Sequence, residues 1–129
     1  MTDHDGKRIL IVDDAALVRA YYRAALEPAG FIVEEALNGL EALERLLLQP
    51  FHLAIVDINM PHMDGITFVR TLRSKDLSVA GVPVLITSTE AGSQDMAAAR
   101  RAGANHYLVK PVDPETLAEY AAIFCGAAR

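Results

Sequence analysis

The fold is indicated by one stretch of sequence, Arg8-Ile-Leu-Ile-Val-Asp-Asp14, in which an apolar run ends in two adjacent carboxylates. A strand that is apolar throughout is typical of a parallel sheet covered on both faces. Two other runs also end on a charged residue, Leu53-Ala-Ile-Val-Asp57 and Tyr107-Leu-Val-Lys110. If these runs are parallel strands of one sheet, their carboxyl ends lie at the edge where open α/β sheets bind ligands. We therefore expect carboxylates and an ammonium group to meet there.

Strand and helix patterns alternate five times along the chain. The predicted strands lie at residues 8–12, 31–36, 53–56, 84–86 and 106–109. Each is followed by a segment in which apolar residues recur at helical spacing, over roughly 17–26, 38–49, 64–74, 93–102 and 113–124. This alternation predicts right-handed crossovers and a parallel sheet.

Local signals mark the ends of the predicted helices. Asn38, with a glutamate three residues later, resembles a capping box, and Asp64 before a glycine is predicted to cap the next helix rather than to act in catalysis. Asp113 places an N-cap acid before a proline in the first helical position. The buried stripe of the helix that follows Asn38 is predicted to consist of Leu40, Leu43, Leu46 and Leu47.

Two doubly wound arrangements fit this order of elements, the dinucleotide-binding type and the flavodoxin type. The five short units favour a five-stranded parallel sheet with the flavodoxin-like order 2-1-3-4-5 and helices on both faces. In that order the first and third strands are neighbours, which places Asp13, Asp14 and Asp57 side by side. Dinucleotide binding is not expected, because the turn after the first strand lacks the glycines that a pyrophosphate requires.

Length and composition limit the classes of protein to consider. With 129 residues, of which 52% are hydrophobic, we expect one domain over residues 1–129 with a core at about 7–124. A net charge of −5 argues against a nucleic-acid partner, because binding to phosphate backbones requires clustered positive charge. The short apolar stretches predict no membrane association and a cytoplasmic location. A single cysteine, Cys125, excludes an internal disulfide.

Carboxylates crowded at one sheet edge need a positive partner. Two carboxylates about 6 Å apart repel each other by roughly 3 kcal/mol at an effective dielectric constant of about 20. Oxygen ligands suit a hard cation, so we expect Mg²⁺, with Mn²⁺ as the alternative. Lys110 and the hydroxyl of Thr87 form a predicted anion pocket beside the metal. Calcium and zinc are not expected, because the sequence shows neither a calcium-binding loop nor histidines at zinc-site spacing.

These residues resemble a known family, the receiver domains of two-component response regulators. The resemblance runs from about residue 7 to 124, and a stand-alone receiver of the chemotaxis-regulator type is expected. Each mark alone is common in unrelated proteins, but their order and their places at strand ends are specific. The marks are Asp13-Asp14, Asp57-Ile-Asn-Met-Pro61, Asp64-Gly65, Thr87 after Val84-Leu-Ile86, and Lys110-Pro111.

The resemblance implies a reaction at Asp57. Its carboxylate would attack the phosphorus of a phosphohistidine on a histidine kinase or phosphotransfer protein and become an aspartyl phosphate. A carboxylate is a weak nucleophile, so positioning and charge neutralisation must supply the catalysis. By position, Lys110 and Thr87 would contact the phosphoryl group. The metal ligands would be Asp13, partly through water, Asp14, Asp57 and the backbone carbonyl of Asn59.

The resemblance also implies a conformational switch. Thr87 would move towards the phosphoryl group and Tyr107 would turn inward behind it, which changes the surface formed by the fourth helix, the fifth strand and the last helix. The output would be altered binding of a downstream target protein. Asn59 and Thr89 stand where residues of this family tune hydrolysis of the phosphate, and the peptide bond between Lys110 and Pro111 is commonly cis.

Several other functions compete with this one. Two alternatives belong to the same family: an intermediate phosphocarrier in a multistep phosphorelay, and the receiver fragment of a larger response regulator. A phosphatase or phosphotransferase with an aspartate nucleophile has a general-acid aspartate two residues later, where this chain has Asn59. We therefore expect self-phosphorylation and self-dephosphorylation without enzyme turnover. A flavin carrier is not expected, because no Ser/Thr/Gly phosphate-binding loop follows the first strand.

Overall fold

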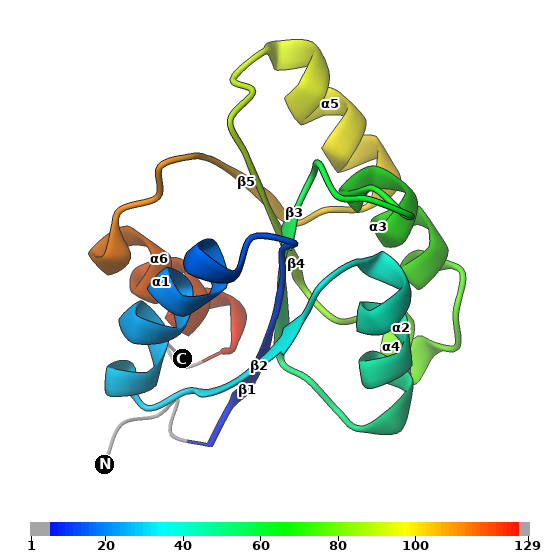
Figure 1. Ribbon diagram of the computed structural model, residues 1–129. Coiled ribbons are helices and arrows are strands. Elements are labelled where there is room, and N and C mark those ends of the chain that lie inside the picture. Colours follow the sequence, from blue (N-terminus) through cyan, green and yellow to red (C-terminus); the bar gives the residue numbers. More distant parts are fainter. Residues whose placement is uncertain (1–5, 127–129) are drawn as a thin grey trace.

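The strands pair in the order expected from the sequence. The computed structural model describes residues 6–126, apart from the side chain of Leu77, and the predicted domain at 1–129 extends beyond this range at both ends. The strands are β1 Arg8–Val12, β2 Ile32–Ala36, β3 Leu53–Asp57, β4 Val84–Ser88 and β5 His106–Val109. They form one sheet in the order β2-β1-β3-β4-β5, and every neighbouring pair is parallel (Figure 1).

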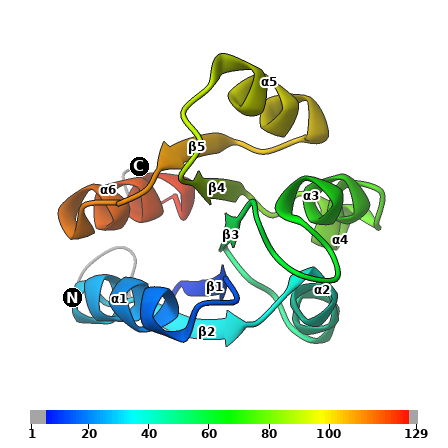
Figure 2. The same cartoon turned by 45° about the horizontal axis from the view of Figure 1, so that its top comes forward.

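Helices cover both faces of this sheet, which confirms the flavodoxin-like fold class. The helices are α1 Ala16–Leu26, α2 Gly39–Leu48, α3 Gly65–Arg73, α4 Leu77–Ala80, α5 Ser93–Ala102 and α6 Pro114–Phe124. Figure 2 shows α1 and α6 on one face and α2 and α3 on the other, and α5 contacts α3. The single-turn helices α4 and η1, Glu27–Ala29, were not predicted, because elements this short show no helical periodicity.

Burial of the central strands explains their unbroken apolar runs. Every residue of β3 and β4 is buried, and so is all of β1 after Arg8. Alternate side chains of β1 enter the two halves of the core. Ile9 and Ile11 pack with residues of α1 and α6, whereas Leu10 and Val12 pack with residues of α2 and α3. The three central strands are therefore shielded from water on both faces, and their carboxyl ends are available to form a site.

The leucine stripe predicted for α2 is half wrong. Leu43 and Leu46 are buried, but Leu40 and Leu47 are 55% and 60% exposed. Ala42, which is fully buried, takes part in the inner face instead. A helix with many leucines does not reveal from its sequence which of them faces the core, because several faces are equally apolar.

The predicted caps are confirmed, and the strand ends shift slightly. Three capping side chains accept a hydrogen bond from the backbone N–H three residues later, namely Asn38, Asp64 and Asp113. β4 continues to Ser88 because residues 87 and 88 still pair with β5. Among the helices of residues 6–126, none has both the length and the apolar character needed to span a bilayer.

Arg73, the last residue of α3, joins that helix to two loops at the other end of the sheet. Its guanidinium donates to the carbonyl of Gly103 at 2.8 and 3.0 Å, and to the carbonyl of Val82 at 2.6 Å. It also donates to the carbonyl of Ala80 and to the side-chain oxygen of Asn105. One side chain thus satisfies backbone groups that the sheet leaves unpaired.

We expect Arg73→Ala to lower the free energy of unfolding by roughly 2 kcal/mol or more, since hydrogen bonds from a charged donor are lost and several carbonyls lose their partner. Urea unfolding measures this change. The matched control is Arg70→Ala, one turn earlier on the exposed side of α3. Equal losses in the two variants would show that the bonds of Arg73 contribute little.

Candidate functional site

Parallel pairing brings four of the predicted site residues to one end of the sheet. Asp13 directly follows β1, and Lys110 directly follows β5. The last pairs of β1 and β3 place Asp13 beside the end of β3, where Asp57 is the final residue. Asp57 is in turn the register partner of Thr87 on β4. Residues far apart in sequence therefore become neighbours because they end adjacent strands.

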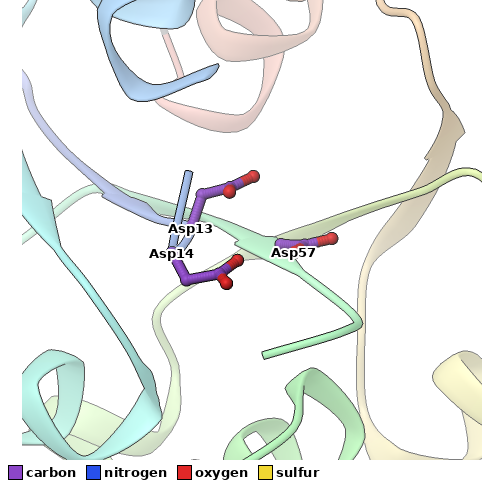
Figure 3. Close-up of side chains that lie close together, drawn as sticks. All are labelled: Asp13, Asp14 and Asp57. Atoms are coloured by element: carbon purple, nitrogen blue, oxygen red, sulfur yellow. The ribbon is translucent and has the colours of Figure 1, made fainter. Parts of the chain in front are cut away.

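The three aspartates form a tight cluster. Asp13, Asp14 and Asp57 each place one carboxylate oxygen within 4.8 Å of the others. Figure 3 shows their side chains leaving adjacent strand ends on the same side of the molecule. Asp13 and Asp57 are 1% and 7% exposed, whereas Asp14 is exposed to solvent. The predicted convergence of the carboxylates is confirmed.

Lys110 is the cation that faces this cluster. Its Nζ donates to Asp13 Oδ2 at 3.1 Å and to Asp57 Oδ1 at 3.2 Å, and the lysine side chain is 18% exposed. These two contacts place the ammonium group between the two buried carboxylates. The peptide bond between Lys110 and Pro111 is cis.

Burial and neighbouring charges shift the pKa values of Asp57 and Lys110. Burial raises the pKa of Asp57, the charge of Asp13 raises it further, and Lys110 lowers it in part, so that the net shift is upward. Burial alone would lower the pKa of Lys110, but its hydrogen bonds to Asp13 and Asp57 outweigh burial and raise it. The lysine stays charged, whereas the ionised form of Asp57 is held at a cost in free energy.

Backbone groups around the site fix the position of Asp13. Its Oδ1 accepts a hydrogen bond from the Ala15 N–H at 2.9 Å. Its main-chain carbonyl accepts one from Arg19 Nη1 at 2.7 Å, and Arg19 also pairs with Glu35 of β2 at 2.7 Å. Arg19 was not among the site residues predicted from the sequence. A basic residue one turn into α1, with a glutamate on the neighbouring strand, was the available signal.

Gly65 allows α3 to begin against the end of β3. A Cβ at this position would lie 2.7 Å from the Asp57 carbonyl oxygen, too close for any side chain. The Gly65 N–H instead donates to the Ile58 carbonyl at 2.9 Å. The dipeptide Asp64-Gly65 therefore has a structural reason, because Asp64 caps the helix and Gly65 permits the close approach.

Thr87 is fully buried, and its hydroxyl has no hydrogen bond within the part of the chain that the structure describes. A buried hydroxyl without a partner costs free energy, so such groups in folded proteins mark sites of ligands, water or movement. Here the hydroxyl belongs to the register partner of Asp57.

The remaining predicted residues lie around the rim. Asn59 is exposed, and its backbone N–H donates to Asp57. Thr89 is exposed and lines a groove of about 420 Å³ together with Lys110. Tyr107 is half-buried, and its hydroxyl donates to the carbonyl of Glu90 at 2.8 Å. The structure thus brings Asn59 and Thr89 beside the site, while the Tyr107 hydroxyl contacts the loop after β4.

Tyr22 was also not among the predicted site residues. It lies on α1 at 2% exposure and lines the groove beside Lys110. Burial raises the pKa of Tyr22, and Lys110 and the side chain of Thr87 lower it in part. A tyrosine at an inward-facing position of a helix that follows the acidic pair was the signal.

The donor set fits Mg²⁺. It consists of carboxylate oxygens, two from buried residues and one from an exposed residue, and has no sulfur or imidazole. Mg²⁺ is held in proteins by one or two carboxylates with water and phosphate oxygens completing the octahedron. Asp13, Asp14 and Asp57 are the residues that would hold the ion.

Comparisons with known proteins agree with this geometry. The family model for the response regulator receiver domain matches residues 9–122. The chain is 35% identical over 121 residues to chemotaxis protein CheY1 of Helicobacter pylori, covering 92% of this chain and 97% of that protein. It is 39% identical over 103 residues to the gliding motility regulatory protein of Myxococcus xanthus, covering 80% of this chain but 13% of that protein.

A solved structure shows the same fold. The crystal structure of chemotaxis protein CheY4 of Vibrio cholerae superposes with a TM-score of 0.87 at 34% identity, covering 92% of this chain and 98% of that one. Sheet order, acidic cluster and family match all lead to one assignment. The chain belongs to the response regulator receiver domain family, whose members act in two-component signalling as phosphoryl acceptors.

Proposed function

We propose that this protein is a signalling switch whose Asp57 accepts a phosphoryl group from the phosphohistidine of a sensor histidine kinase or phosphotransfer protein. The observation that supports the proposal most strongly is the acidic cluster at the strand ends, in which Lys110 contacts both buried carboxylates. Such a site has the charge balance required for an oxygen-bound cation and a phosphoryl group.

The transfer is a substitution at phosphorus. A carboxylate oxygen of Asp57 forms the new O–P bond while the P–N bond to the donor imidazole breaks, and its electron pair stays on the imidazole nitrogen, which takes up a proton. Bound Mg²⁺ would neutralise charge on the phosphoryl oxygens. Asp13, Asp14, Asp57 and the Asn59 carbonyl would hold the ion, and Mn²⁺ would serve in its place. Lys110 would exchange its bond to Asp57 for one to a phosphoryl oxygen.

The output is a change of surface. Thr87 would donate its hydroxyl, which has no partner in the described structure, to a phosphoryl oxygen. Tyr107 would leave its bond to the Glu90 carbonyl and turn inward, altering the face formed by α5, β5 and α6. A downstream target protein would read that face. Asn59 and Thr89, both exposed beside the site, would set the rate of hydrolysis.

Two alternatives stay within the family. An intermediate phosphocarrier in a multistep phosphorelay would use the same site, and the small share of the Myxococcus xanthus protein that this chain covers supports a receiver that is part of a larger regulator. A turnover phosphatase is disfavoured, because Asn59 offers no general acid. The single domain at 1–129, the cytoplasmic location and the absence of nucleic-acid and membrane partners stay predictions.

We expect the intact mass to increase by one phosphoryl group when the protein is incubated with acetyl phosphate and Mg²⁺, and not when the metal is chelated. Asp57→Asn should abolish the adduct, because an amide is not a nucleophile here. The control is Asp64→Asn, which changes an exposed capping aspartate near Asp57. An adduct that survives in Asp57→Asn would place the acceptor on another residue.

The raised pKa of Asp57 predicts a pH-dependent gain in stability for Asp57→Asn in metal-free buffer. Below the ordinary value of 3.8, the carboxyl is protonated in both the folded and unfolded states and contributes nothing. As the pH rises through the higher folded pKa, the ionised carboxylate destabilises the folded state. Thermal unfolding should therefore show little difference between wild type and Asp57→Asn near about pH 3 and a more stable variant near about pH 7.

Mg²⁺ should reduce this difference at neutral pH. At a concentration about ten times its Kd, the ion stabilises the wild-type fold by about 1.4 kcal/mol by mass action, and the variant less, because it lacks a ligand. A pH-independent difference, or equal stabilisation of both proteins by Mg²⁺, would contradict the assignment of Asp57 to the metal site.

Lys110→Ala should leave Mg²⁺ affinity largely intact but uncouple phosphorylation from the change in surface. Lys110 is a cation beside the carboxylates and not a metal ligand. Because it directly follows β5, its contact with the phosphoryl group would link phosphorylation to the position of that strand. Amide NMR shifts of α5, β5 and α6 on addition of Mg²⁺ and beryllofluoride, a phosphoryl mimic, measure the coupling. Lys75→Ala, at an exposed lysine, is the control. Wild-type shifts in Lys110→Ala would exclude this role.

A further inference from the structure

Helix α1 carries two adjacent tyrosines in contrasting environments. Tyr21 is 46% exposed, and its hydroxyl donates to the carbonyl of Val112 at 3.2 Å. Tyr22 is 2% exposed and packs in the half of the core that contains Leu85 of β4. Because side chains alternate along a strand, Thr87 extends from the same face of β4 as Leu85. Tyr22 and Thr87 therefore lie on the same side of the sheet, the side that α1 and α6 cover.

Tyr22 shares a groove with Lys110 at the site. Burial raises the pKa of Tyr22, Lys110 and the side chain of Thr87 lower it, and the carboxylates of Asp13 and Asp57 raise it. Thr89 lines the same groove, so α1 places Tyr22 at the phosphoacceptor end of the sheet. Tyr22 is thus a polar group from α1 beside a cluster otherwise built from strand ends.

Thr87 supplies an independent observation. It is 0% exposed, and its hydroxyl makes no hydrogen bond of ordinary geometry to any described residue. Tyr22 is buried on the same side of the sheet, and the side chain of Thr87 lowers the pKa of its phenol. Burial excludes bulk water as a substitute partner, so a small movement that aligns the two hydroxyls would relieve an unpaired group.

We propose that Tyr22 is a positioning residue for Thr87: once Asp57 is phosphorylated, the Tyr22 hydroxyl donates to Thr87 Oγ1 while Thr87 donates to a phosphoryl oxygen. This inference rests on the proposed function of Asp57 and Thr87. A threonine hydroxyl has one donor and two acceptor sites, so both bonds form together. Hydrogen bonds in such a chain polarise one another, which strengthens the bond to the phosphoryl group.

An apolar role for Tyr22 predicts a different result. Its ring lines the groove beside Lys110 and Thr89, and a phenylalanine would fill the same space. If packing were its only role, Tyr22→Phe would behave as wild type in every step that involves the phosphoryl group. The hydroxyl alone distinguishes the two roles.

The test is a titration of the protein with beryllofluoride in saturating Mg²⁺, in which amide NMR resonances report binding. We expect Tyr22→Phe to bind the mimic about two- to ten-fold more weakly than wild type, the effect of one net hydrogen bond, with unchanged Mg²⁺ affinity. Tyr21→Phe, which removes the neighbouring hydroxyl, is the matched control and should bind as wild type. In a Thr87→Val background, Tyr22→Phe should cause no further loss.

The outcomes separate the inference from the proposed function. Wild-type protein that binds no beryllofluoride would overturn both. Wild-type protein that binds it, with equal affinity in Tyr22→Phe, would overturn the role of Tyr22 alone. An equal loss in Tyr22→Phe with and without the Thr87 hydroxyl would overturn it too, because the two side chains would then act independently.

Discussion

Two buried carboxylates side by side, held by one lysine, are the constraint on which this end of the molecule depends. Asp13 and Asp57 are almost inaccessible to water, and Lys110 reaches one oxygen of each. The two carboxylates carry one more unit of charge than Lys110 neutralises, so part of the buried negative charge has no counter-charge, and burying it costs free energy. The arrangement therefore contributes little to stability. A cation or a phosphoryl group that binds here changes the electrostatic energy of Asp13, Asp57 and Lys110 together.

The fold builds this cluster with little freedom. The register of β3 against β4 places Asp57 beside Thr87, and the ends of β1 and β3 place Asp13 beside Asp57. Gly65 then allows α3 to start against the Asp57 carbonyl, where any side chain would clash. Rigid, fully buried strands hold the reacting groups, while loops and helix ends supply the parts that move.

Helix α1 contributes more than cover for the sheet. Arg19 connects the main chain of Asp13 to Glu35 on the edge strand, and Tyr22 lines the groove beside Lys110. Both residues lie on α1, which packs against α6, one of the elements of the proposed output face.

The sequence by itself determined the order of elements, the caps at Asn38 and Asp113, and the acidic cluster, because each depends on local pattern or on the rule that parallel strand ends share an edge. Only the tertiary structure decided which leucines of α2 are buried, since Leu40 and Leu47 fit a helical stripe as well as their buried neighbours do. It also decided the surroundings of Tyr22, because contacts between a helix and a distant strand depend on how the helix is rotated against the sheet, which no local spacing encodes.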